Sequence, residues 1–252
     1  MSGPLQTPPA DAATVQKLAP TGRLQAGVVQ APSAGVFFVL ATQASPEGVA
    51  VDFLTALAGA AGIPIDFTVF PNSGECTEAL AAGAIDVAFM PVDDERRRKV
   101  AFGPAYYLLR STFLIAAGSD IRSLADYQTR GRRFVGIAGT TTLRAAVRMF
   151  GPERAVAAPS VAEAMRQVST GEADAVALSE DYLRMVQPEV PGSHLLAEAF
   201  QETSVSVAVP KGRPDALAFV GAFVERAKQS GLLRGIFDRH GLEAQPLAPA
   251  GV

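Results

Sequence analysis

Residues 83–107 read GAIDVAFMPVDDERRRKVAFGPAYY, and this stretch decides the fold. Gly83 follows an apolar helical segment and is typical of a helix end. The apolar run 87–90 then predicts a buried strand, which Pro91 ends. In residues 93–99 three acids precede four bases, and this order predicts a short helix, because it complements the helix dipole.

Arg96 is the one base of this segment without an acid four residues before it. Positions 93/97, 94/98 and 95/99 are all acid–base pairs of the favourable polarity, so a solvated helix is one interpretation of the segment. The other interpretation is an anion site at Arg96, just past a buried strand, because a planar guanidinium suits a carboxylate.

The composition is that of a globular protein. The chain has 252 residues, 48% hydrophobic and 19% charged, which is enough for one large domain or two lobes. A net charge of −3 gives no electrostatic reason to expect a nucleic-acid partner. Cys76 is the single cysteine, which excludes an internal disulfide. His194 and His240 lack the spacing of metal ligands, so we expect neither a metal nor a cofactor.

The chain shows no membrane or targeting segment. No apolar run reaches about 18 residues, the length that a membrane span needs. Residues 1–22 lack the basic and apolar regions of a signal peptide, and their Pro, Ala and Thr content predicts a flexible arm. We expect either that an export signal has been removed or that the protein is not exported by that route.

The second half of the chain repeats the pattern of the first. Residues 83–88, Gly-Ala-Ile-Asp-Val-Ala, correspond to residues 171–176, Gly-Glu-Ala-Asp-Ala-Val. Each follows an apolar helix and precedes an apolar strand, which predicts two α/β lobes of similar construction. We place the crossings between the lobes near 110–113 and 202–204, with a cleft between discontinuous lobes.

Apolar periodicity and turn residues predict the remaining elements. We expect helices at 48–62, 75–82, 143–150, 161–170, 180–186, 214–230 and 232–240. We expect strands at 24–29, 63–70, 106–109, 111–116, 134–138, 175–178, 194–196 and 204–209.

The central stretch resembles the signature of ABC-transporter periplasmic solute-binding proteins of the polar amino-acid-binding type, family 3. In that family the run is roughly G-x-x-D…T-x-x-R…v-x-F-S-x-P-Y, and its arginine binds the ligand's carboxylate. Arg96 stands six residues before Phe102, as that arginine does, while Asp93 replaces the usual threonine and Gly103 the usual serine. The resemblance covers about residues 24–241.

This resemblance implies an α/β fold of the two-lobed, periplasmic-binding-protein-like type II, a clamshell with two hinge crossovers. The expected division is a flexible arm at 1–22, a discontinuous first lobe at 23–111 plus 204–245, a second lobe at 112–203, and a frayed tail at 246–252.

The resemblance also implies a set of ligand-binding residues. The turn that begins at Gly139 offers threonine hydroxyls and backbone amides, which either cap the following helix or bind an anion. The family carries a similar Gly-Thr that contacts the carboxylate. We therefore expect Thr140, Thr141 and Thr142 to lie opposite Arg96 across the cleft.

The remaining expected lining comes from the first lobe. Phe37 and Phe38 stand where the family's loop covers the ligand, and the alternative is that either ring belongs to the core. Met90 and Val92, at the end of the central strand, are the other two candidates.

One position departs from the amino-acid binders. In those proteins an acid about five residues beyond the second G-x-x-D holds the ligand's ammonium, and here Ser179 stands at that place, followed by Glu180. A serine can hydrogen-bond an amine but cannot neutralise it in a buried cleft. Either Glu180 has taken over this role, or the ligand is not an α-amino acid.

The function that the resemblance implies is capture of a small carboxylate-bearing molecule by a periplasmic monomer, for uptake through an ABC-transporter permease. We expect an amino acid or amino-acid derivative first and an amine-free carboxylate second. Two alternatives are a cyclohexadienyl-dehydratase-like enzyme, with Glu180 or else Asp181 as proton donor, and a ligand-sensing domain. The sequence shows no Ser-His-Asp or Cys-His arrangement, so we expect binding without catalysis.

Overall fold

The computed structural model describes residues 11–42, 45–130 and 132–252. Its helices are α1 (Ala12–Leu18), α2 (Val49–Ala61), α3 (Ser73–Ala81), α4 (Asp94–Lys99), α5 (Leu124–Arg130), α6 (Thr141–Phe150), α7 (Val161–Ser169), α8 (Glu180–Val186), α9 (Pro214–Gln229) and α10 (Leu232–Arg239). Its strands are β1 (Leu24–Gln30), β2 (Phe38–Ala41), β3 (Pro46–Glu47), β4 (Ile65–Phe70), β5 (Val87–Pro91), β6 (Val100–Ile115), β7 (Phe134–Ile137), β8 (Ala155–Ala158), β9 (Ala175–Ser179), β10 (His194–Leu195) and β11 (Gln201–Pro210). Every helix and strand that the sequence predicted is present, although the two runs at 106–109 and 111–116 form the single strand β6.

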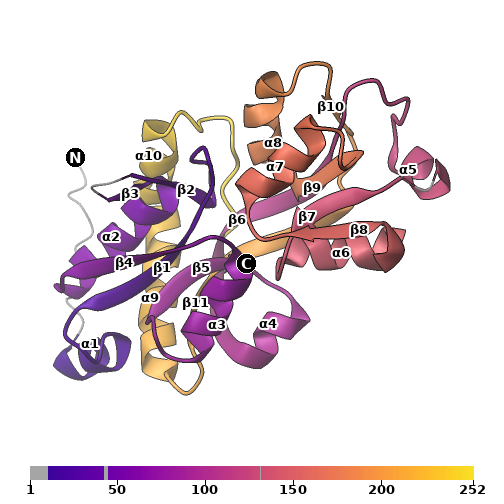
Figure 1. The fold of residues 1–252 in the computed structure, drawn as a ribbon. Helices are drawn as coiled ribbons and strands as arrows, with labels where there is room; N and C mark the ends of the chain where they lie inside the picture. Colours follow the sequence, from indigo (N-terminus) through magenta and orange to yellow (C-terminus); the bar gives the residue numbers. More distant parts are fainter. Residues whose placement is uncertain (1–10, 43–44, 131) are drawn as a thin grey trace.

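The strands form a mixed sheet in the order β3-β2-β1-β5-β11-β6-β9-β7-β8, with β4 beside β1 and β10 beside β6. β1 is parallel to β2, β4 and β5, and β7 is parallel to β8 and β9. The antiparallel strands β11 and β6 join these two parallel groups. Figure 1 shows two halves side by side. The first holds β1 to β5 and, from the far end of the chain, α9 and α10; the second holds α5 to α8 and β7 to β10. This confirms the predicted two-lobed α/β fold.

β6 and β11 run side by side through both halves of the molecule. In their ladder Arg110 is paired with Glu202, and Ser111 with Gln201. The two crossings that we predicted from the sequence therefore face each other in one antiparallel pair of strands.

The two Gly-x-x-Asp segments fold in the same way. The glycine of each has a positive φ, 73° in the first and 75° in the second, which ends the preceding helix at little steric cost. Asp86 N donates to Gln25 O at 2.7 Å, and Gln25 N donates back to Asp86 Oδ2 at 3.1 Å. Asp174 exchanges the same two hydrogen bonds with Arg133, at 3.2 and 3.1 Å. Each aspartate thus joins its strand to the start of the neighbouring parallel strand.

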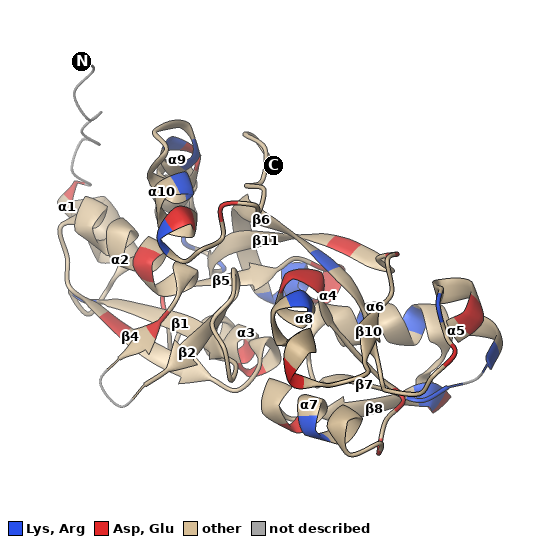
Figure 2. Ribbon diagram, turned by 90° about the horizontal axis from the view of Figure 1, so that it is seen from above, with Lys and Arg blue, Asp and Glu red and all other residues tan. Residues whose placement is uncertain are grey.

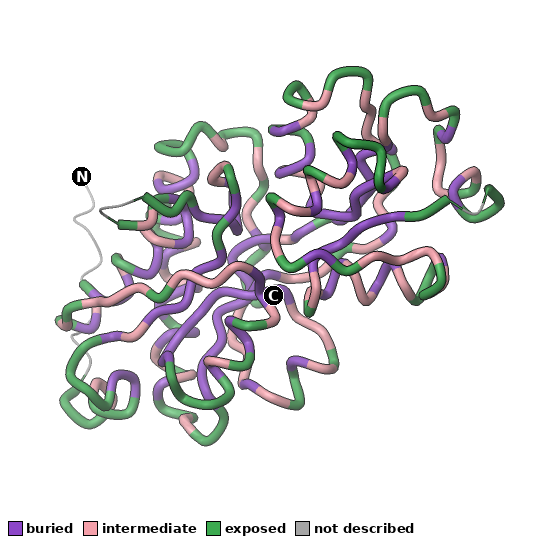
Figure 3. Tube along the Cα trace, viewed as in Figure 1, coloured by how far each residue is buried: buried purple, intermediate pink, exposed green. Residues whose placement is uncertain are grey.

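The trace is mostly buried along the strands of both halves (Figure 3), and aromatic rings pack there. In the first half Phe53 stacks on Phe89, with ring centroids 5.1 Å apart. In the second half Phe113 stacks on Tyr127 at 4.5 Å, and Phe150 meets Phe113 edge-on at 5.2 Å. Such pairs add to the stability that area burial alone provides, so each half is a well-packed body.

The described part of the N-terminal arm is folded, which corrects our prediction for it. Residues 1–10 of that arm lie outside the described residues. Asp11 caps α1 by accepting a hydrogen bond from Thr14 N at 2.7 Å, and Leu18 is completely buried where α1 packs on α9. A helix cap and one apolar anchor outweigh the loop-like composition of this segment.

The C-terminal tail is also docked rather than frayed. Ala248 is 3% exposed, and its N–H donates to Tyr106 O of β6 at 3.0 Å. Lys228 Nζ donates to Pro249 O at 2.9 Å. The tail gains these backbone bonds because it lies beside the long strand β6.

Candidate ligand-binding site

A small enclosed cavity lies between the two halves. Its volume is about 20 Å³, little more than one water molecule needs. Its apolar walls include Val29, Phe37, Phe38, Leu109, Ile137 and Leu178. Its polar walls are formed by Asn72, Ser73, Thr140, Thr141, Thr142 and Ser179. The two predicted phenylalanines, the three predicted threonines and the predicted serine therefore all line this cavity.

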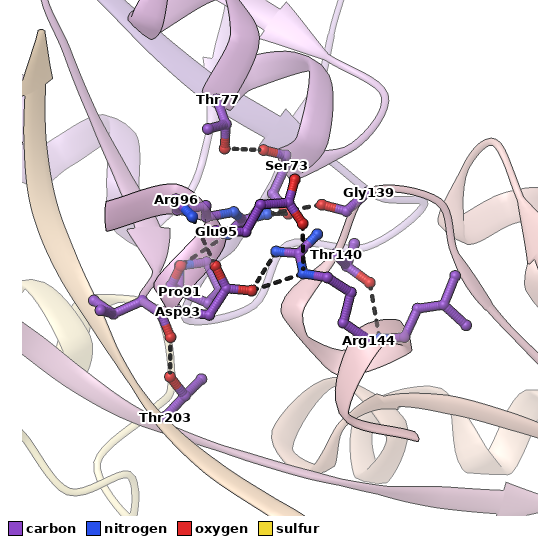
Figure 4. Close-up of polar contacts among 12 residues, drawn as sticks. Ser73, Thr77, Pro91, Asp93, Glu95, Arg96, Gly139, Thr140, Arg144 and Thr203 are labelled. Atoms are coloured by element: carbon purple, nitrogen blue, oxygen red, sulfur yellow. Dashed lines mark hydrogen bonds and ion pairs between the residues drawn. The ribbon is translucent and has the colours of Figure 1, made fainter. Parts of the chain in front are cut away.

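Arg96 lies beside this cavity in the first turn of α4, and it is 1% exposed (Figure 4). Its Nη1 donates to Pro91 O at 2.9 Å, and its Nη2 donates to Ser73 Oγ at 2.7 Å and to Gly139 O at 3.1 Å. Its Nε has no partner among the described residues. Since Gly139 belongs to the second half, the Arg96 guanidinium connects the two halves.

The Arg96 guanidinium bonds no described acid directly, although Asp93 and Glu95 lie near enough to favour its charged form. All three of its acceptors are neutral oxygens, and no Asp or Glu that the structure describes forms an ion pair with it. Burial lowers the pKa of Arg96 to about 10, and the nearby Arg144 adds to this effect, so the guanidinium is still charged at neutral pH. A buried cation with only neutral acceptors attracts an anion, which would form stronger, charge-assisted hydrogen bonds.

The acids of the α4 segment form only part of the pairing that the solvated-helix interpretation would give. Asp93 is the N-cap of α4, accepting from Arg96 N at 2.9 Å on Oδ1. Its Oδ2 accepts from Arg144 Nε of α6 at 2.7 Å instead of pairing with Arg97. Of the three pairs in that interpretation, the described residues form the one between Glu95 and Lys99, at 3.2 Å. The helix therefore contacts the opposite half rather than solvent alone.

Further contacts close the two halves along this edge. Asn72 Nδ2 donates to Pro159 O at 3.2 Å. The backbones approach so closely that a Cβ added to Gly74 would lie 2.9 Å from Gly139 Cα. The described structure is thus a closed arrangement, and a ligand larger than water can enter the cavity only when the halves separate.

The three threonines at 140–142 have hydroxyls in different surroundings. Thr140 caps α6, accepting from Leu143 N at 3.1 Å and donating to Ile137 O at 2.7 Å. Thr142 Oγ1 lies 3.0 Å from Ser111 Oγ, within hydrogen-bond distance. Thr141 Oγ1 is buried and has no partner among the described residues. Thr141 is therefore the hydroxyl of this turn that is available to a ligand.

Phe37 and Phe38 line the cavity and also belong to the buried core. They are 5% and 7% exposed, and their rings meet edge-on with centroids 5.1 Å apart. Phe38 also meets Tyr182 of α8 edge-on at 5.1 Å. Because Tyr182 belongs to the second half, this aromatic group would part when the halves separate.

The structure does not bring Met90 and Val92 to the cavity. Met90 is completely buried, and its Sδ accepts from Thr77 Oγ1 at 3.5 Å. Val92 N donates to Ser204 O of β11 at 2.9 Å. Successive side chains of a strand point to opposite faces, so Pro91, between these two residues, lines the cavity in their place.

Ser179 and Glu180 are adjacent but lie in different places. Ser179 is 2% exposed and lines the cavity, and its Oγ makes no hydrogen bond of normal geometry with a described residue. Glu180 Oε1 accepts from Arg184 Nε at 3.0 Å, and its Oε2 lies 3.4 Å from Arg110 Nε. Glu180 lines a separate hollow of about 150 Å³ near the crossing strands.

Asp181 lies behind Ser179 and lines the same separate hollow. Its Oδ2 faces Gly35 of the first half, and its Oδ1 is enclosed without a partner of normal geometry among the described residues. Burial raises the pKa of Asp181. Hydrogen bonds from Ser179 and from backbone amides act in the opposite direction and partly offset this effect.

The sequence reasoning missed Ser73, Asn72 and Arg144. One signal could have located the first two, because Asn72 followed by Glu75 three residues later is a helix N-cap pattern. Asn72 Oδ1 does accept from Glu75 N at 2.9 Å, which places Ser73 at the start of α3 beside Arg96. No local pattern points to Arg144, because its partners are distant in the sequence.

Charged residues lie mostly on helices and loops, while the strands are mostly neutral (Figure 2). Within the described ranges we find no cluster of three or more His, Cys, Asp or Glu that could hold a metal ion. The helices of those ranges are too short or too polar to cross a bilayer.

Comparison with known proteins gives consistent results. A sequence profile of the bacterial extracellular solute-binding proteins, family 3, matches residues 29–243. The ABC transporter glutamine-binding protein GlnH of Bacillus subtilis (strain 168) is 26% identical over 163 residues, which are 64% of this chain and 59% of that protein.

Solved structures show the same fold. An ancestral arginine-binding protein bound to glutamine superposes with a TM-score of 0.74 and 24% identity, over 86% of this chain and 97% of that one. The substrate-binding protein of an amino acid ABC transporter gives 0.77 and 22%, over 86% and 98%. An ancestral amino acid-binding protein, a precursor of cyclohexadienyl dehydratase, gives 0.77 and 22%, over 90% and 98%.

Proposed function

Since the chain belongs to the bacterial extracellular solute-binding proteins of family 3, we propose that it captures a small carboxylate-bearing molecule between its halves for uptake by an ABC transporter. The observation that carries this proposal is Arg96, a completely buried cation whose acceptors are all neutral. A ligand carboxylate would replace Gly139 O or Ser73 Oγ as its partner and would neutralise it.

The proposed site combines the cavity walls with Arg96, which lines the adjoining open hollow and reaches the cavity-lining Ser73. Arg96 anchors the carboxylate, Thr141 and Ser73 supply hydroxyls to it, and Phe37 and Phe38 form an apolar wall for the rest of the ligand. The N-terminus of α6 adds backbone amides, which favour an anion.

Ligand entry requires opening, and the crossing strands are the proposed hinge. We place the first lobe at 23–111 plus 204–245 and the second at 112–203, so that the boundaries fall where β6 and β11 are paired. Closure around a ligand is the motion that two lobes joined in this way perform. Small-angle scattering should show compaction when ligand is added.

The partner that we propose is the permease of an ABC transporter, met outside the cytoplasmic membrane, in the periplasm. The family and the glutamine-binding relative support this role. We propose that the chain acts as a monomer.

The test is substitution of Arg96. Arg96→Ala should weaken binding of a carboxylate ligand by at least about 2 kcal/mol, because it leaves the ligand charge buried without a partner. Arg96→Lys, the matched control, keeps the charge but loses the fork and should bind at an intermediate level. Titration calorimetry measures both, and full affinity in Arg96→Ala would refute the assignment.

We propose binding without catalysis. The candidate proton donor Glu180 is held by Arg184 and Arg110 outside the cavity, which speaks against the dehydratase alternative. Incubation with prephenate or arogenate should give no aromatic product. Turnover that is lost in Glu180→Gln would favour the enzyme instead.

A further inference from the structure

We infer that the ligand is a monoanionic carboxylate without an ammonium group, carried on an apolar body. This inference rests on the proposed function, because it concerns the same cavity and the same arginine. It reverses the order of ligand classes that the sequence resemblance favours.

The first step is the chemistry of the cavity walls. None of the described residues that line the cavity is an Asp or a Glu. The residues outside the described part, 1–10, 43–44 and 131, also include no Asp or Glu. A ligand ammonium would therefore meet only hydroxyl, amide and carbonyl groups, which can accept a hydrogen bond but cannot neutralise it.

The second step is the position of the nearest acids. Glu180 is held by Arg184 and Arg110 in the separate hollow near the crossing strands. Asp181 is buried with its Oδ2 facing Gly35, and it is absent from the walls of the cavity. Both line the hollow near the crossing strands and not the cavity.

The acids on the opposite side are also engaged. An open hollow of about 510 Å³ is lined by Arg96, and its walls include the acids Glu75, Glu78 and Glu95. Glu75 Oε1 accepts from Asn72 Nδ2 at 2.8 Å, Glu78 Oε1 accepts from Lys99 Nζ at 2.6 Å, and Glu95 pairs with Arg144 and Lys99, each at 3.2 Å. None of these carboxylates lines the cavity.

The third step is the charge balance. Arg96 contributes one positive charge whose guanidinium bonds no described acid, and the nearby Asp93 and Glu95 are both paired with Arg144. A ligand with one carboxylate and no amine supplies the counter-charge that the hydrogen bonds of Arg96 lack. A zwitterionic amino acid would leave a net positive charge in a dry space, which is strongly unfavourable.

The shape of the ligand follows from the remaining walls. Phe37, Phe38, Ile137 and Leu178 provide an apolar surface from both halves. Two aromatic edges favour an aromatic or branched aliphatic body. An arylalkanoate or a branched-chain fatty acid of similar size to an amino acid fits this description.

Matched ligand pairs test the inference directly on the whole chain. The pairs 3-phenylpropanoate and phenylalanine, and 4-methylpentanoate and leucine, differ only in the amino group. Thermal shift and titration calorimetry should show the amine-free acid binding at least about 100-fold more tightly, because the ammonium loses its hydration without gaining a counter-charge.

A designed reversal provides the second test. Ser179→Asp places a carboxylate in the cavity wall and should raise the affinity for the amino acid of each pair while lowering that for the amine-free acid. Ser179→Asn is the matched control, equal in size but neutral, and should keep the original order. The wild-type ranking decides the question even where Ser179→Asp does not fold.

A third variant addresses the acid nearest to the cavity. If Asp181 supplied a counter-charge to an ammonium, Asp181→Asn would abolish amino-acid binding and spare the amine-free acid. We expect the ligand order in Asp181→Asn to match that of the wild type.

The outcomes separate this inference from the proposed function. Equal or tighter binding of the amino acids overturns the inference and leaves carboxylate capture intact. Failure of both members of every pair to bind, across a panel of side chains, overturns carboxylate capture and the inference with it.

Discussion

The two halves of the molecule contain the same structural unit with different chemistry. In the first half, Asn72 caps α3, a Gly-x-x-Asp segment leads into β5, and Asp93 caps α4. In the second half, Ser160 caps α7, a Gly-x-x-Asp segment leads into β9, and Ser179 stands at the N-cap position of α8. The two aspartates make the same pair of hydrogen bonds, one through the backbone N–H and one through the carboxylate.

The difference lies at the end of each unit that reaches the cleft. The first unit delivers a buried guanidinium at Arg96 and a fully used cap at Asp93. The second delivers a serine whose hydroxyl has no normal partner among the described residues. The fold of a half thus depends on the glycine and the aspartate, while the ligand chemistry that we propose depends on the residues just beyond the strand.

The largest expected effect is on folding, at Asp86. Its side chain is 5% exposed and also pairs with Arg213 Nη1 at 2.7 Å. Asp86→Ala should lower the free energy of unfolding by about 3–5 kcal/mol, because it leaves a partly buried arginine without its partner. Urea denaturation measures this loss. Asp86→Asn, which keeps the acceptor for Gln25 N, should lose less.

The equivalent change in the second unit should cost less. The Asp174 side chain is 38% exposed, and its ion pair with Arg132 is long, at 3.6 Å. Asp174→Ala should lower the free energy of unfolding by about 1 kcal/mol, mainly through the lost hydrogen bond to Arg133 N. Equal losses of unfolding free energy in Asp86→Ala and Asp174→Ala would show that the deeper burial of Asp86 adds no stability.

A smaller effect is expected on closure, through Asp93 and Arg144. Burial opposes ionisation of Asp93, but hydrogen bonds from Arg96 N and Arg144 outweigh it and lower the pKa of Asp93. The pair therefore supports closure above the ordinary aspartate pKa of about 3.9 and loses this contribution as the pH falls through the lowered pKa. Arg144→Ala should weaken ligand binding at pH 7 by about 0.5–1 kcal/mol.

The pH dependence of this pair needs its own control, because the ligand carboxylate titrates in the same range. Asp93→Asn removes the titrating group, so the difference in affinity between wild type and Asp93→Asn should shrink as the pH falls below 4 or so. A constant difference across the whole pH range would show that Asp93 acts only as a helix cap.

The smallest effect is expected at Ser179. Ser179→Ala removes a buried hydroxyl without a normal partner, so the free energy of unfolding of the ligand-free protein should change by close to zero. Thermal unfolding tests this. A clear loss of stability would mean that Ser179 Oγ is hydrogen-bonded to the nearby Asp181.

The fold could be predicted because its signals are local. Gly83 and Gly171 end helices, and the strands that follow are apolar runs bounded by turn residues, as the structure confirms. The crossing positions near 110–113 and 202–204 stay a prediction. The residues at 11–22 were harder to predict, because a single buried leucine decided their conformation against the composition.

The candidate site was less accessible to sequence reasoning, because its contacts join distant segments. The neighbours of Arg96 come from Ser73 and Gly139, which lie 23 and 43 positions away. The partner of Asp93 is Arg144, 51 positions away, so spacing along the helix does not identify it. Strand alternation could have shown that Pro91, and not Met90 or Val92, faces the cavity.

Because Cys76 is unreactive, a fluorophore attached to an added cysteine can report whether the two halves open. Cys76 is the single cysteine of the chain, it is completely buried, and burial raises the pKa of its thiol to about 12. Thiol reagents react with the thiolate, so the native protein offers them almost no target at neutral pH. The side chain of Glu78 is 64% exposed beside the open hollow. A cysteine introduced at this position would react with a fluorophore, while Cys76 would stay unlabelled. The labelled protein would then serve as an optical reporter of its own ligand.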